Sequence, residues 1–206
     1  MKIIKSIFSG IILILVTLVV FILKIPFLIL FPTRVVGKKN LKGIKTGAVI
    51  AINHFSNFDI VYILVKLFYN LFSLSYLGKK ELSKNKLFGV FLSCLGTIFI
   101  SRGEADLKAM REVNSALKNK KRVLMFPEGT RNKTGSDEMQ TIKSGVVFFA
   151  KKAQVPIIPI KIEHRARLFR LNKIYIGEPH MVGQNKTQEE VEILTQKFNN
   201  LSPSRF

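Results

Sequence analysis

The chain has 206 residues, which is enough for one sizeable domain with a short appendage. Its formal net charge of +20 indicates an anionic partner, such as nucleic acid, an anionic membrane surface or acidic substrates. The single cysteine, Cys94, excludes an internal disulfide framework and a multi-cysteine metal site, and the three scattered histidines lack zinc-ligand spacing, so we expect no metal.

The N-terminal region is strongly apolar. Residues 7–23 carry no charge, and at ~1.5 Å per residue they would form a helix about 25 Å long, which is short against a hydrocarbon core of ~30 Å. Lys24 and Pro26 interrupt this run before a second apolar run at residues 25–32. No small-residue cleavage site follows, which argues against a signal peptide. Two interpretations remain: one tilted spanning helix, or two shorter helices that bend at residues 24–26 and lie in one leaflet.

Basic residues place the rest of the chain. Only Lys2 and Lys5 precede the apolar region, whereas five basic residues follow it within a short distance: Arg34, Lys38, Lys39, Lys42 and Lys45. The positive-inside rule therefore predicts a cytoplasmic main domain under either topology. The same residues attract anionic headgroups, at roughly 1 kcal/mol each near the surface. We predict an N-terminal membrane segment at residues 1–36, a domain at residues 37–206, and a location on the cytoplasmic face of the cell membrane.

From residue 47 onward, strand and helix patterns alternate. The predicted strands are residues 48–52, 71–77, 97–101, 123–126, 156–162 and 173–176. The predicted helices are residues 60–69, 87–95 with Gly96 as C-cap, about 104–119, 144–153, and a last helix that a capping box opens at residues 187–190, with Val191, Leu194, Phe198 and Leu201 facing inward. This alternation predicts a single α/β domain with a mostly parallel or mixed sheet flanked by helices.

A histidine stands directly after the first strand of this domain. The block at residues 53–59 reads NHFSNFD, so His54 follows a buried strand and Asp59 lies five residues further on. A histidine at a strand end is rigidly held yet faces a cleft, where a base is useful. Asp59 can bond the second ring nitrogen and stabilise the imidazolium. Ser56 and Asp59 also have capping-box spacing, so a purely structural role for Asp59 stays open.

Three further blocks fall at predicted strands. They are residues 96–102 (GTIFISR), 126–131 (FPEGTR) and 155–160 (VPIIPI). Sites in open α/β sheets gather beyond the carboxyl ends of the strands, so His54, Arg102 and Arg131 converge if their strands are neighbours. Arginine offers forked donors that suit a phosphate, and Gly129 lets backbone amides approach the same anion. Taken singly, residues 127–129 are equally typical of an ordinary turn with Thr130 as a cap, and Arg102 of a solvated charge.

Together and in this order, the four blocks resemble the motifs of the glycerol-phosphate acyltransferase superfamily, most closely those of the bacterial 1-acyl-glycerol-3-phosphate acyltransferases. The pair His54 and Asp59 is similar to the catalytic signature of that family, a histidine and an aspartate separated by four residues. The other blocks resemble its second, third and fourth motifs. The resemblance covers residues 49–160. It departs from the family at Ser101, where relatives often carry an acidic residue.

The resemblance implies transfer of a fatty acyl group from a thioester to the free hydroxyl of a 1-acyl-glycerol 3-phosphate, with His54 as general base and Asp59 orienting it. It also implies a phosphate and glycerol site made by Arg102, Glu128, Gly129, Thr130 and Arg131. Secondary candidates around this site are Asn53, Lys143, Ser144 and Gly145, of which Asn53 alternatively satisfies backbone groups at the strand end. We expect no permanently bound cofactor. Acyl-CoA or acyl-ACP is the expected co-substrate, and membrane lipids are the expected partners.

Two other functions compete with this interpretation. An acyltransferase of the same superfamily that acts on another lysophospholipid or an aminolipid would carry the same motifs, because arginine clamps suit many phosphate esters. A membrane-tethered nucleic-acid-binding protein would explain the net charge of +20. The basic residues are dispersed, however, and no nucleic-acid motif with interleaved aromatics is present, so no nucleic-acid partner is expected.

Overall fold

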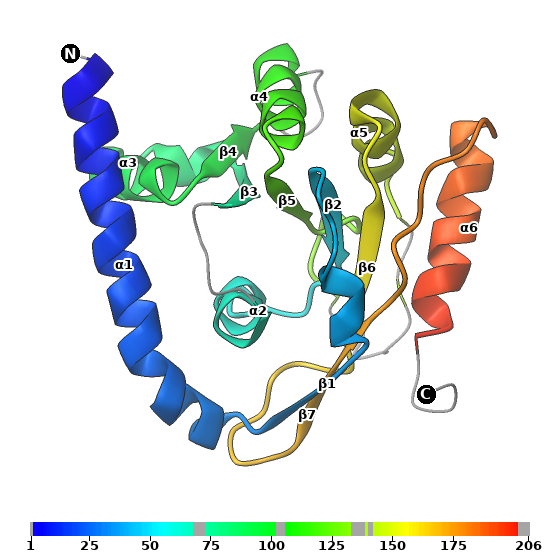
Figure 1. Cartoon of the computed structure of the whole chain (residues 1–206), viewed down its shortest axis with the longest axis horizontal. Coiled ribbons are helices and arrows are strands. Elements are labelled where there is room, and N and C mark those ends of the chain that lie inside the picture. Colours follow the sequence, from blue (N-terminus) through cyan, green and yellow to red (C-terminus); the bar gives the residue numbers. More distant parts are fainter. Residues whose placement is uncertain (1, 68–72, 102–105, 133–138, 140–141, 202–206) are drawn as a thin grey trace.

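A seven-stranded sheet organises the chain, in the order β1-β7-β6-β2-β5-β3-β4 (Figure 1). The computed structural model describes residues 2–67, 73–101, 106–132, 139 and 142–201. The strands are β1 (Thr33–Val36), β2 (Ala48–Ile52), β3 (Leu74–Lys79), β4 (Thr97–Ile100), β5 (Arg122–Met125), β6 (Ile157–Ile162) and β7 (Asn172–Ile176). All five residues of β2 are buried, as expected for the continuous apolar run of a central strand.

The sheet is mixed and mostly parallel, as predicted. β2 pairs in parallel with β5 and β6, and β3 pairs in parallel with β5 and β4. Only β6 and β7 are antiparallel, while β1 runs parallel to β7. Five strands, β2 to β6, therefore end at one side of the sheet, which we call the carboxyl edge.

Helices cover both faces of the sheet. They are α1 (Lys2–Leu30), α2 (Asp59–Leu67), α3 (Lys86–Cys94), α4 (Leu107–Lys118), α5 (Gly145–Ala153) and α6 (Thr187–Asn199), with short 3-10 helices η1 (Lys38–Leu41) and η3 (Lys80–Ser83). Buried side chains of α4, α5 and α6 share one core cluster, and those of α2 share the other with the end of α1. The predicted helices and strands agree with these bounds to within a few residues. Parts of three of them, at residues 68–69, 71–72 and 104–105, lie outside the described residues.

Two elements differ from the sequence-based expectation. β1 was not predicted, because its four residues directly follow the apolar run and its partner β7 lies far along the chain. It lies within residues 1–36, and the division of the chain at residue 36 stays a prediction. The capping box of α6 is wrong, since no side chain caps that helix. Glu190 instead bonds His180 Nε2 at 2.9 Å and the Gly183 amide at 3.0 Å, so it fastens the preceding loop. The inward face of α6 is confirmed, because the four predicted residues are buried: Val191, Leu194, Phe198 and Leu201.

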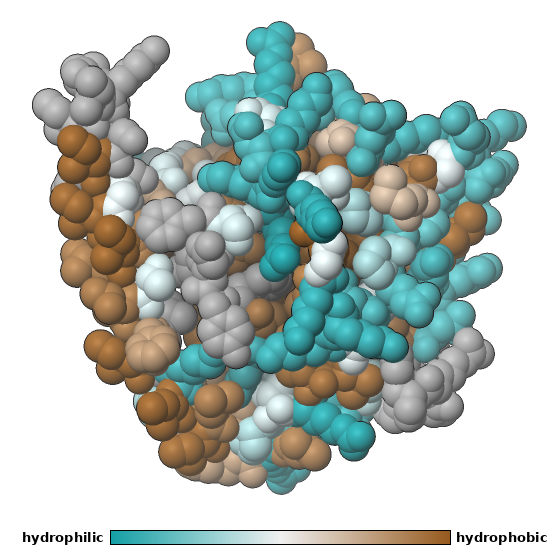
Figure 2. Space-filling view, in the orientation of Figure 1, coloured by the Kyte–Doolittle hydropathy of each residue, from teal (hydrophilic) through white to brown (hydrophobic). Residues whose placement is uncertain are grey.

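Helix α1 is bent. The axes of Gly10–Val19 and Lys24–Leu30 differ by 45°, and Pro26 lies inside the second part, where it lacks the N–H that a helix interior requires. Within the described residues, no single helix has the length and apolar composition of a membrane span, and these two parts meet that criterion only together. Large apolar side chains are exposed along α1, as the brown column on the left of Figure 2 shows.

Aromatic rings hold the end of α1 against α2. The ring of Phe27 stacks on that of Phe58 with centroids 5.6 Å apart, and Phe31 lies 5.2 Å from Phe58. The ring of Tyr62, which is fully buried, has its centroid 6.3 Å from that of Phe27 and from that of Phe31. The Tyr62 hydroxyl also lies 3.0 Å from Thr33 Oγ1, so α2 contacts the first residue of β1 as well.

A buried lysine completes this junction. Lys66 on α2 is only 7% exposed, and its Nζ donates to the carbonyl of Phe31 at 2.6 Å and to that of Phe27 at 3.4 Å. These carbonyls belong to the end of α1, where backbone acceptors lack helical partners. Burial, reinforced by the charge of Lys24, lowers the pKa of Lys66 to about 8. The lysine therefore caps α1 from within the domain.

Replacing this lysine tests the junction. Lys66→Met keeps much of the side-chain volume but leaves the carbonyls without their donor, which costs about 1–3 kcal/mol. In a chain of this size, each kcal/mol lowers Tm by roughly 2–4 °C. Thermal unfolding of the full chain in detergent measures the shift, with Lys108→Met, at an 88% exposed side chain on α4, as control. Equal Tm values for the two variants would contradict the capping role.

Candidate active site

A buried carboxylate holds the histidine that follows β2. His54 Nδ1 lies 3.0 Å from Asp59 Oδ2, and the Asp59 side chain is fully buried. The same oxygen accepts the backbone amides of Phe55 and Ser56, each at 2.7 Å, and Oδ1 accepts the Ser56 hydroxyl at 2.9 Å. An ionised carboxylate oxygen can only accept hydrogen bonds, so Nδ1 must carry the hydrogen in its contact with Oδ2. In the neutral imidazole, Nε2 then has no hydrogen and keeps the lone pair that a base needs.

Asp59 orients the histidine and caps the turn at the same time. One half of the predicted capping box is formed, because the Asp59 carboxylate accepts the Ser56 amide. The other half is replaced: Ser56 Oγ accepts from the Phe58 amide at 3.2 Å, and the Asp59 amide donates to the Ser56 carbonyl at 3.1 Å. The two roles that the sequence left open are therefore combined in one side chain.

The segment after β5 encloses His54 from the other side. The imidazole stacks on the ring of Phe126, with centroids 3.9 Å apart and planes at 18°. The His54 amide donates to Glu128 Oε1 at 3.1 Å, and its carbonyl accepts from the Asn132 amide at 2.6 Å. Backbone and ring of the histidine are thus both fixed by neighbouring strand ends, as expected for paired parallel strands.

A tight turn follows β5. The Gly129 amide donates to the Phe126 carbonyl at 3.0 Å, and Gly129 has φ +70°, which favours glycine. A Cβ added at Gly129 would lie 2.9 Å from Lys143 Nζ, so the ammonium group rests directly against this turn. The Lys143 amide donates to the Pro127 carbonyl at 2.9 Å and fixes the base of that side chain.

Other predicted site residues lie around this turn. Thr130 and Arg131 have exposed side chains, and Arg131 directly precedes the Asn132 amide that contacts His54. Ser144 precedes the first turn of α5 and Gly145 begins it, next to Lys143. The structure therefore gathers these residues at the carboxyl edge beside His54.

Two predicted residues stand apart. Asn53 donates to the Ile162 carbonyl and accepts the Ile162 amide, each at 2.8 Å, so it joins β2 to β6 as a backbone partner. Arg102 lies outside the described residues. Its neighbour Ser101 directly follows β4, and the Ser101 amide donates to the Asp106 carboxylate at 3.0 Å.

Glu128 is in an unusual state for a carboxylate. It is 4% exposed, and within the described residues Oε2 has no hydrogen-bond partner, although Oε1 accepts the His54 amide. Burial raises the pKa of Glu128, against the lowering effect of the His54 amide and ring, while nearby Asp59 adds to the rise. An unfilled buried acceptor is costly, so this oxygen is suited to receive a hydroxyl or cationic donor from a ligand.

An apolar cavity of about 260 Å³ adjoins the turn. Its lining includes Phe126, Gly129 and Lys143 at the site, and it extends along Leu77, Ile100, Met125, Val146 and Phe149. A larger cavity of about 530 Å³ lies at the opposite edge, bounded by η1, the end of β7 and the end of α6. Of these two cavities, the smaller one is relevant to His54, because residues that surround the histidine line it and do not line the larger one.

Sequence reasoning missed two contributors. Phe126 was noted only as part of a motif, and its position at the exit of a strand next to Pro-Glu-Gly is the signal that it faces the site. Asn132 is buried and acts through its backbone amide. No side-chain pattern reports such a contact, so nothing in the sequence marks it.

The fold and the contact between His54 and Asp59 define a class of α/β protein with a histidine–carboxylate pair at the carboxyl edge of its sheet. The family model described as Acyltransferase matches residues 32–163 of this chain. The chain therefore belongs to the acyltransferase family, which confirms the resemblance found in the motifs.

Curated relatives agree with this family. The chain is 31% identical over 139 residues to a 1-acyl-sn-glycerol-3-phosphate acyltransferase of Saccharomyces cerevisiae, covering 66% of this chain and 44% of the relative. It is 31% identical to a protein of that name from Helicobacter pylori, over 65% of this chain and 56% of the relative. The chain thus spans about half the length of these two. A Bacillus subtilis protein of the same name is 27% identical over 82% of this chain and 87% of its own.

A solved structure supports the fold. The crystal structure of the 1-acyl-sn-glycerophosphate acyltransferase PlsC from Thermotoga maritima superposes with a TM-score of 0.60 at 25% identity. The match covers 82% of this chain and 71% of that one. The α/β domain with a mixed sheet flanked by helices is therefore shared.

The state of Glu128 gives a pH-dependent prediction. Its folded pKa lies above the ordinary value of 4.5, so the folded state binds more protons between the two values and loses stability as the pH rises through that window. Glu128→Gln removes this loss and still offers an acceptor to the His54 amide. We expect the variant to have the higher Tm at pH 7, with the difference shrinking as the pH falls toward 4. A difference that does not change with pH would contradict the raised pKa.

Proposed function

We propose that this chain transfers a fatty acyl group from a thioester, acyl-CoA or acyl-ACP, to the free hydroxyl of 1-acyl-glycerol 3-phosphate, giving phosphatidate. The observation that carries the proposal is the 3.0 Å contact between His54 Nδ1 and the buried Asp59 carboxylate, beside a glycine turn at the carboxyl edge. The names of the curated relatives and of the Thermotoga structure support the acceptor.

In this mechanism His54 is the general base. The acceptor hydroxyl attacks the thioester carbonyl carbon as Nε2 takes its proton, because an alcohol is a poor nucleophile unless it is deprotonated during attack. Asp59 holds the imidazolium that forms. The tetrahedral intermediate collapses and expels the thiolate. Nε2 then gives this thiolate the proton that it took from the acceptor hydroxyl. No covalent acyl-enzyme is needed, because one base serves both directions of proton transfer.

The phosphate of the acceptor fits the turn after β5. Arg131 and Lys143 supply positive charge there, and Gly129 lets the ligand approach the backbone. Lys143 Nζ rests against Gly129, which supports its part in this anion site. Arg102, which lies outside the described residues, is assigned to the phosphate by its motif alone. Glu128 Oε2 accepts a glycerol hydroxyl, which fills the oxygen that the protein leaves without a partner.

The membrane is the proposed location of this reaction. Large exposed apolar side chains along α1 support attachment, and the basic residues after α1 support a cytoplasmic domain. The acceptor then reaches the carboxyl edge by its headgroup while its acyl chain stays in the bilayer. The apolar cavity beside Phe126 suits an acyl chain as well.

Another lysophospholipid or an aminolipid is the competing acceptor. Arginine and lysine bind any phosphate ester, so the residues of the turn do not distinguish among them. Assays with a panel of lysolipids, each with acyl-CoA and with acyl-ACP, separate these acceptors and donors. Transfer only to a different lysolipid would replace the acceptor in this proposal.

Substitution of the base tests the mechanism. His54→Ala should lower kcat by about 10²–10⁴-fold, because no other group takes the hydroxyl proton. Turnover of the purified full chain with lysophosphatidate measures the loss, while circular dichroism and vesicle sedimentation confirm folding and attachment. His180→Gln, which removes another histidine and can still donate to Glu190, is the matched control. Wild-type turnover in His54→Ala would refute the role of His54.

Substitution in the phosphate site should affect the acceptor. Arg131→Ala removes a charged hydrogen-bond donor, which is worth about 1.5–3 kcal/mol, so the KM for the phosphate-bearing acceptor should rise about 10- to 100-fold. The KM for the acyl donor should stay close to the wild-type value. Arg111→Ala, at an exposed position on α4, is the control. A change confined to donor kinetics would place Arg131 with the donor instead.

A further inference from the structure

The connection between β6 and β7 combines exposed apolar and basic side chains. Residues 164–171 contain three arginines and no carboxylate. Leu168, Phe169 and Leu171 are 55%, 72% and 55% exposed, and Arg165, Arg167 and Arg170 are exposed as well. Nothing in the proposed reaction uses these side chains. An exposed patch of this composition indicates an interaction surface.

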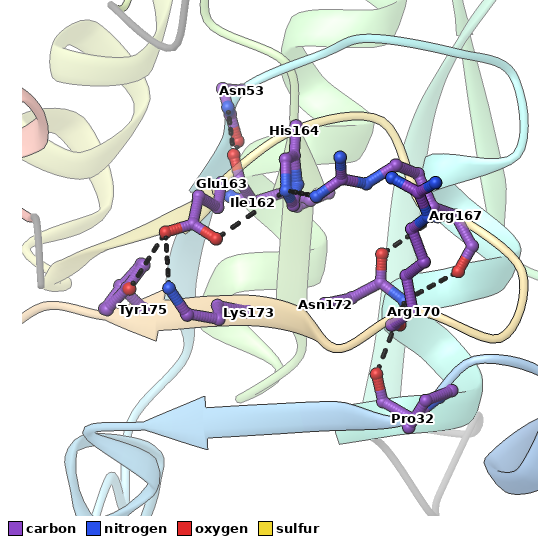
Figure 3. Close-up of polar contacts among 10 residues, drawn as sticks. All are labelled: Pro32, Asn53, Ile162, Glu163, His164, Arg167, Arg170, Asn172, Lys173 and Tyr175. Carbon is purple, nitrogen blue, oxygen red and sulfur yellow. Dashed lines mark hydrogen bonds and ion pairs between the residues drawn. The ribbon is translucent and has the colours of Figure 1, made fainter.

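A buried asparagine gives this loop a fixed shape. Asn172 is 1% exposed, and its Oδ1 accepts the Arg167 amide at 2.8 Å (Figure 3). Its Nδ2 donates to the carbonyls of Arg167 at 2.9 Å and Arg170 at 2.8 Å. The loop is therefore folded back on the start of β7, which leaves its apolar and arginine side chains on the outside.

Among the described residues, Glu163 is the carboxylate at the base of the loop, and it is already paired. Glu163 Oε1 accepts from Lys173 Nζ at 3.0 Å and from the Tyr175 hydroxyl at 3.3 Å (Figure 3). Its Oε2 lies 3.7 Å from His164 Nε2. This carboxylate is bonded to Lys173 and Tyr175 of β7 and is not paired with the arginines of the loop. The arginines can therefore present their positive charge to an outside partner.

The loop is also tied to the end of α1. The Phe169 amide donates to the Leu30 carbonyl at 2.7 Å, and Phe169 adopts φ +54°, which is a strained backbone conformation for a residue with a side chain. The Asn172 amide donates to the Pro32 carbonyl at 2.8 Å. These two bonds bring the exposed loop residues next to the exposed apolar side chains at the end of α1, which are Ile25, Leu28, Ile29 and Leu30.

We propose that residues 164–171 and the last two turns of α1 form one surface that binds an anionic lipid bilayer. The arginines bind lipid phosphates, and Leu168, Phe169 and Leu171 enter the boundary between headgroups and acyl chains. Continuity with the apolar end of α1 favours a bilayer over an acidic protein, and Figure 2 shows apolar and polar side chains mixed at the bottom of the molecule. This inference rests on the proposed membrane location.

The surface also sets the position of the active site. Two residues before the loop lies Ile162, the end of β6, whose backbone is held by Asn53 next to His54. The carboxyl edge therefore lies close to the bilayer whenever the loop is bound. A lipid headgroup then has a short path to His54.

A single tryptophan reports the depth of the loop. The chain contains no tryptophan, so Phe169→Trp introduces the only indole. With the full chain on phosphatidylglycerol vesicles, we expect a blue-shifted emission that lipids with brominated acyl chains quench. Phe148→Trp, at an exposed position on α5 on the other face of the sheet, should remain unquenched. Unquenched emission from Phe169→Trp in sedimented, vesicle-bound protein would overturn the proposal and favour a protein partner.

Charge removal tests the arginines separately. The triple variant Arg165→Gln, Arg167→Gln and Arg170→Gln should bind phosphatidylglycerol vesicles about 100-fold more weakly, at roughly fivefold per arginine. Binding to neutral phosphatidylcholine vesicles should be unchanged. A control triple on α4 removes the same charge: Lys108→Gln, Arg111→Gln and Lys118→Gln. Equal losses in both triples would mean that only net charge matters and would overturn the proposal.

The activity of these variants separates the two proposals. In detergent micelles with dispersed acceptor, the loop triple variant should transfer acyl groups at the wild-type rate, because it lacks no residue of the active site. Loss of vesicle binding with micellar transfer retained supports the loop surface. Absence of transfer in the wild type and every variant would refute the proposed function. The lipid-binding proposal would then be judged by the fluorescence and vesicle-binding measurements, which do not depend on activity.

Discussion

The carboxylate of Asp59 is the contact on which the site depends. A buried carboxylate without partners would be strongly unfavourable, and this one is stabilised by four donors: the amides of Phe55 and Ser56, the Ser56 hydroxyl and His54 Nδ1. Three of the donors shape the turn between β2 and α2, and the fourth fixes the orientation of the His54 imidazole. The fold of the turn and the geometry of the base therefore have one physical cause, and neither changes without the other.

Helix α2 carries this constraint to the rest of the molecule. It begins at Asp59, and further along it Tyr62 packs against the rings of α1 and Lys66 caps the α1 carbonyls. The end of α1 in turn binds the β6–β7 loop through the Phe169 amide. A continuous set of contacts thus connects the surface proposed to bind lipid with His54, the proposed base. The nine-residue helix α2 links the two regions because its first residue contacts His54 and its last turn contacts the end of α1.

Much of the fold and site follows from local sequence patterns. Apolar runs that end in polar blocks predicted the central strands and the meeting of His54 with the β5 turn, because parallel strands share one carboxyl edge. β1 escaped prediction because a four-residue edge strand adjoining an apolar helix has no pattern of its own. The predicted capping box of α6 was wrong because Glu190 accepts hydrogen bonds from three donors in the preceding loop instead. Local residue spacing does not encode such contacts. Backbone contacts such as that of Asn132 are invisible for the same reason.

Glu128 is a buried carboxylate whose desolvation the described residues offset only in part. The protein buries this carboxylate, fills one oxygen with the His54 amide and leaves the other without a donor among the described residues. A structural role alone would be met as well by a neutral amide, which is cheaper to bury. An ionised carboxylate becomes favourable once a ligand hydroxyl donates to Oε2. Because Oε1 accepts the His54 amide, that hydroxyl would then lie close to His54. Burial raises the pKa of Glu128, and a buried carboxylate with an open oxygen beside His54 is the arrangement that the proposed hydroxyl acceptor requires.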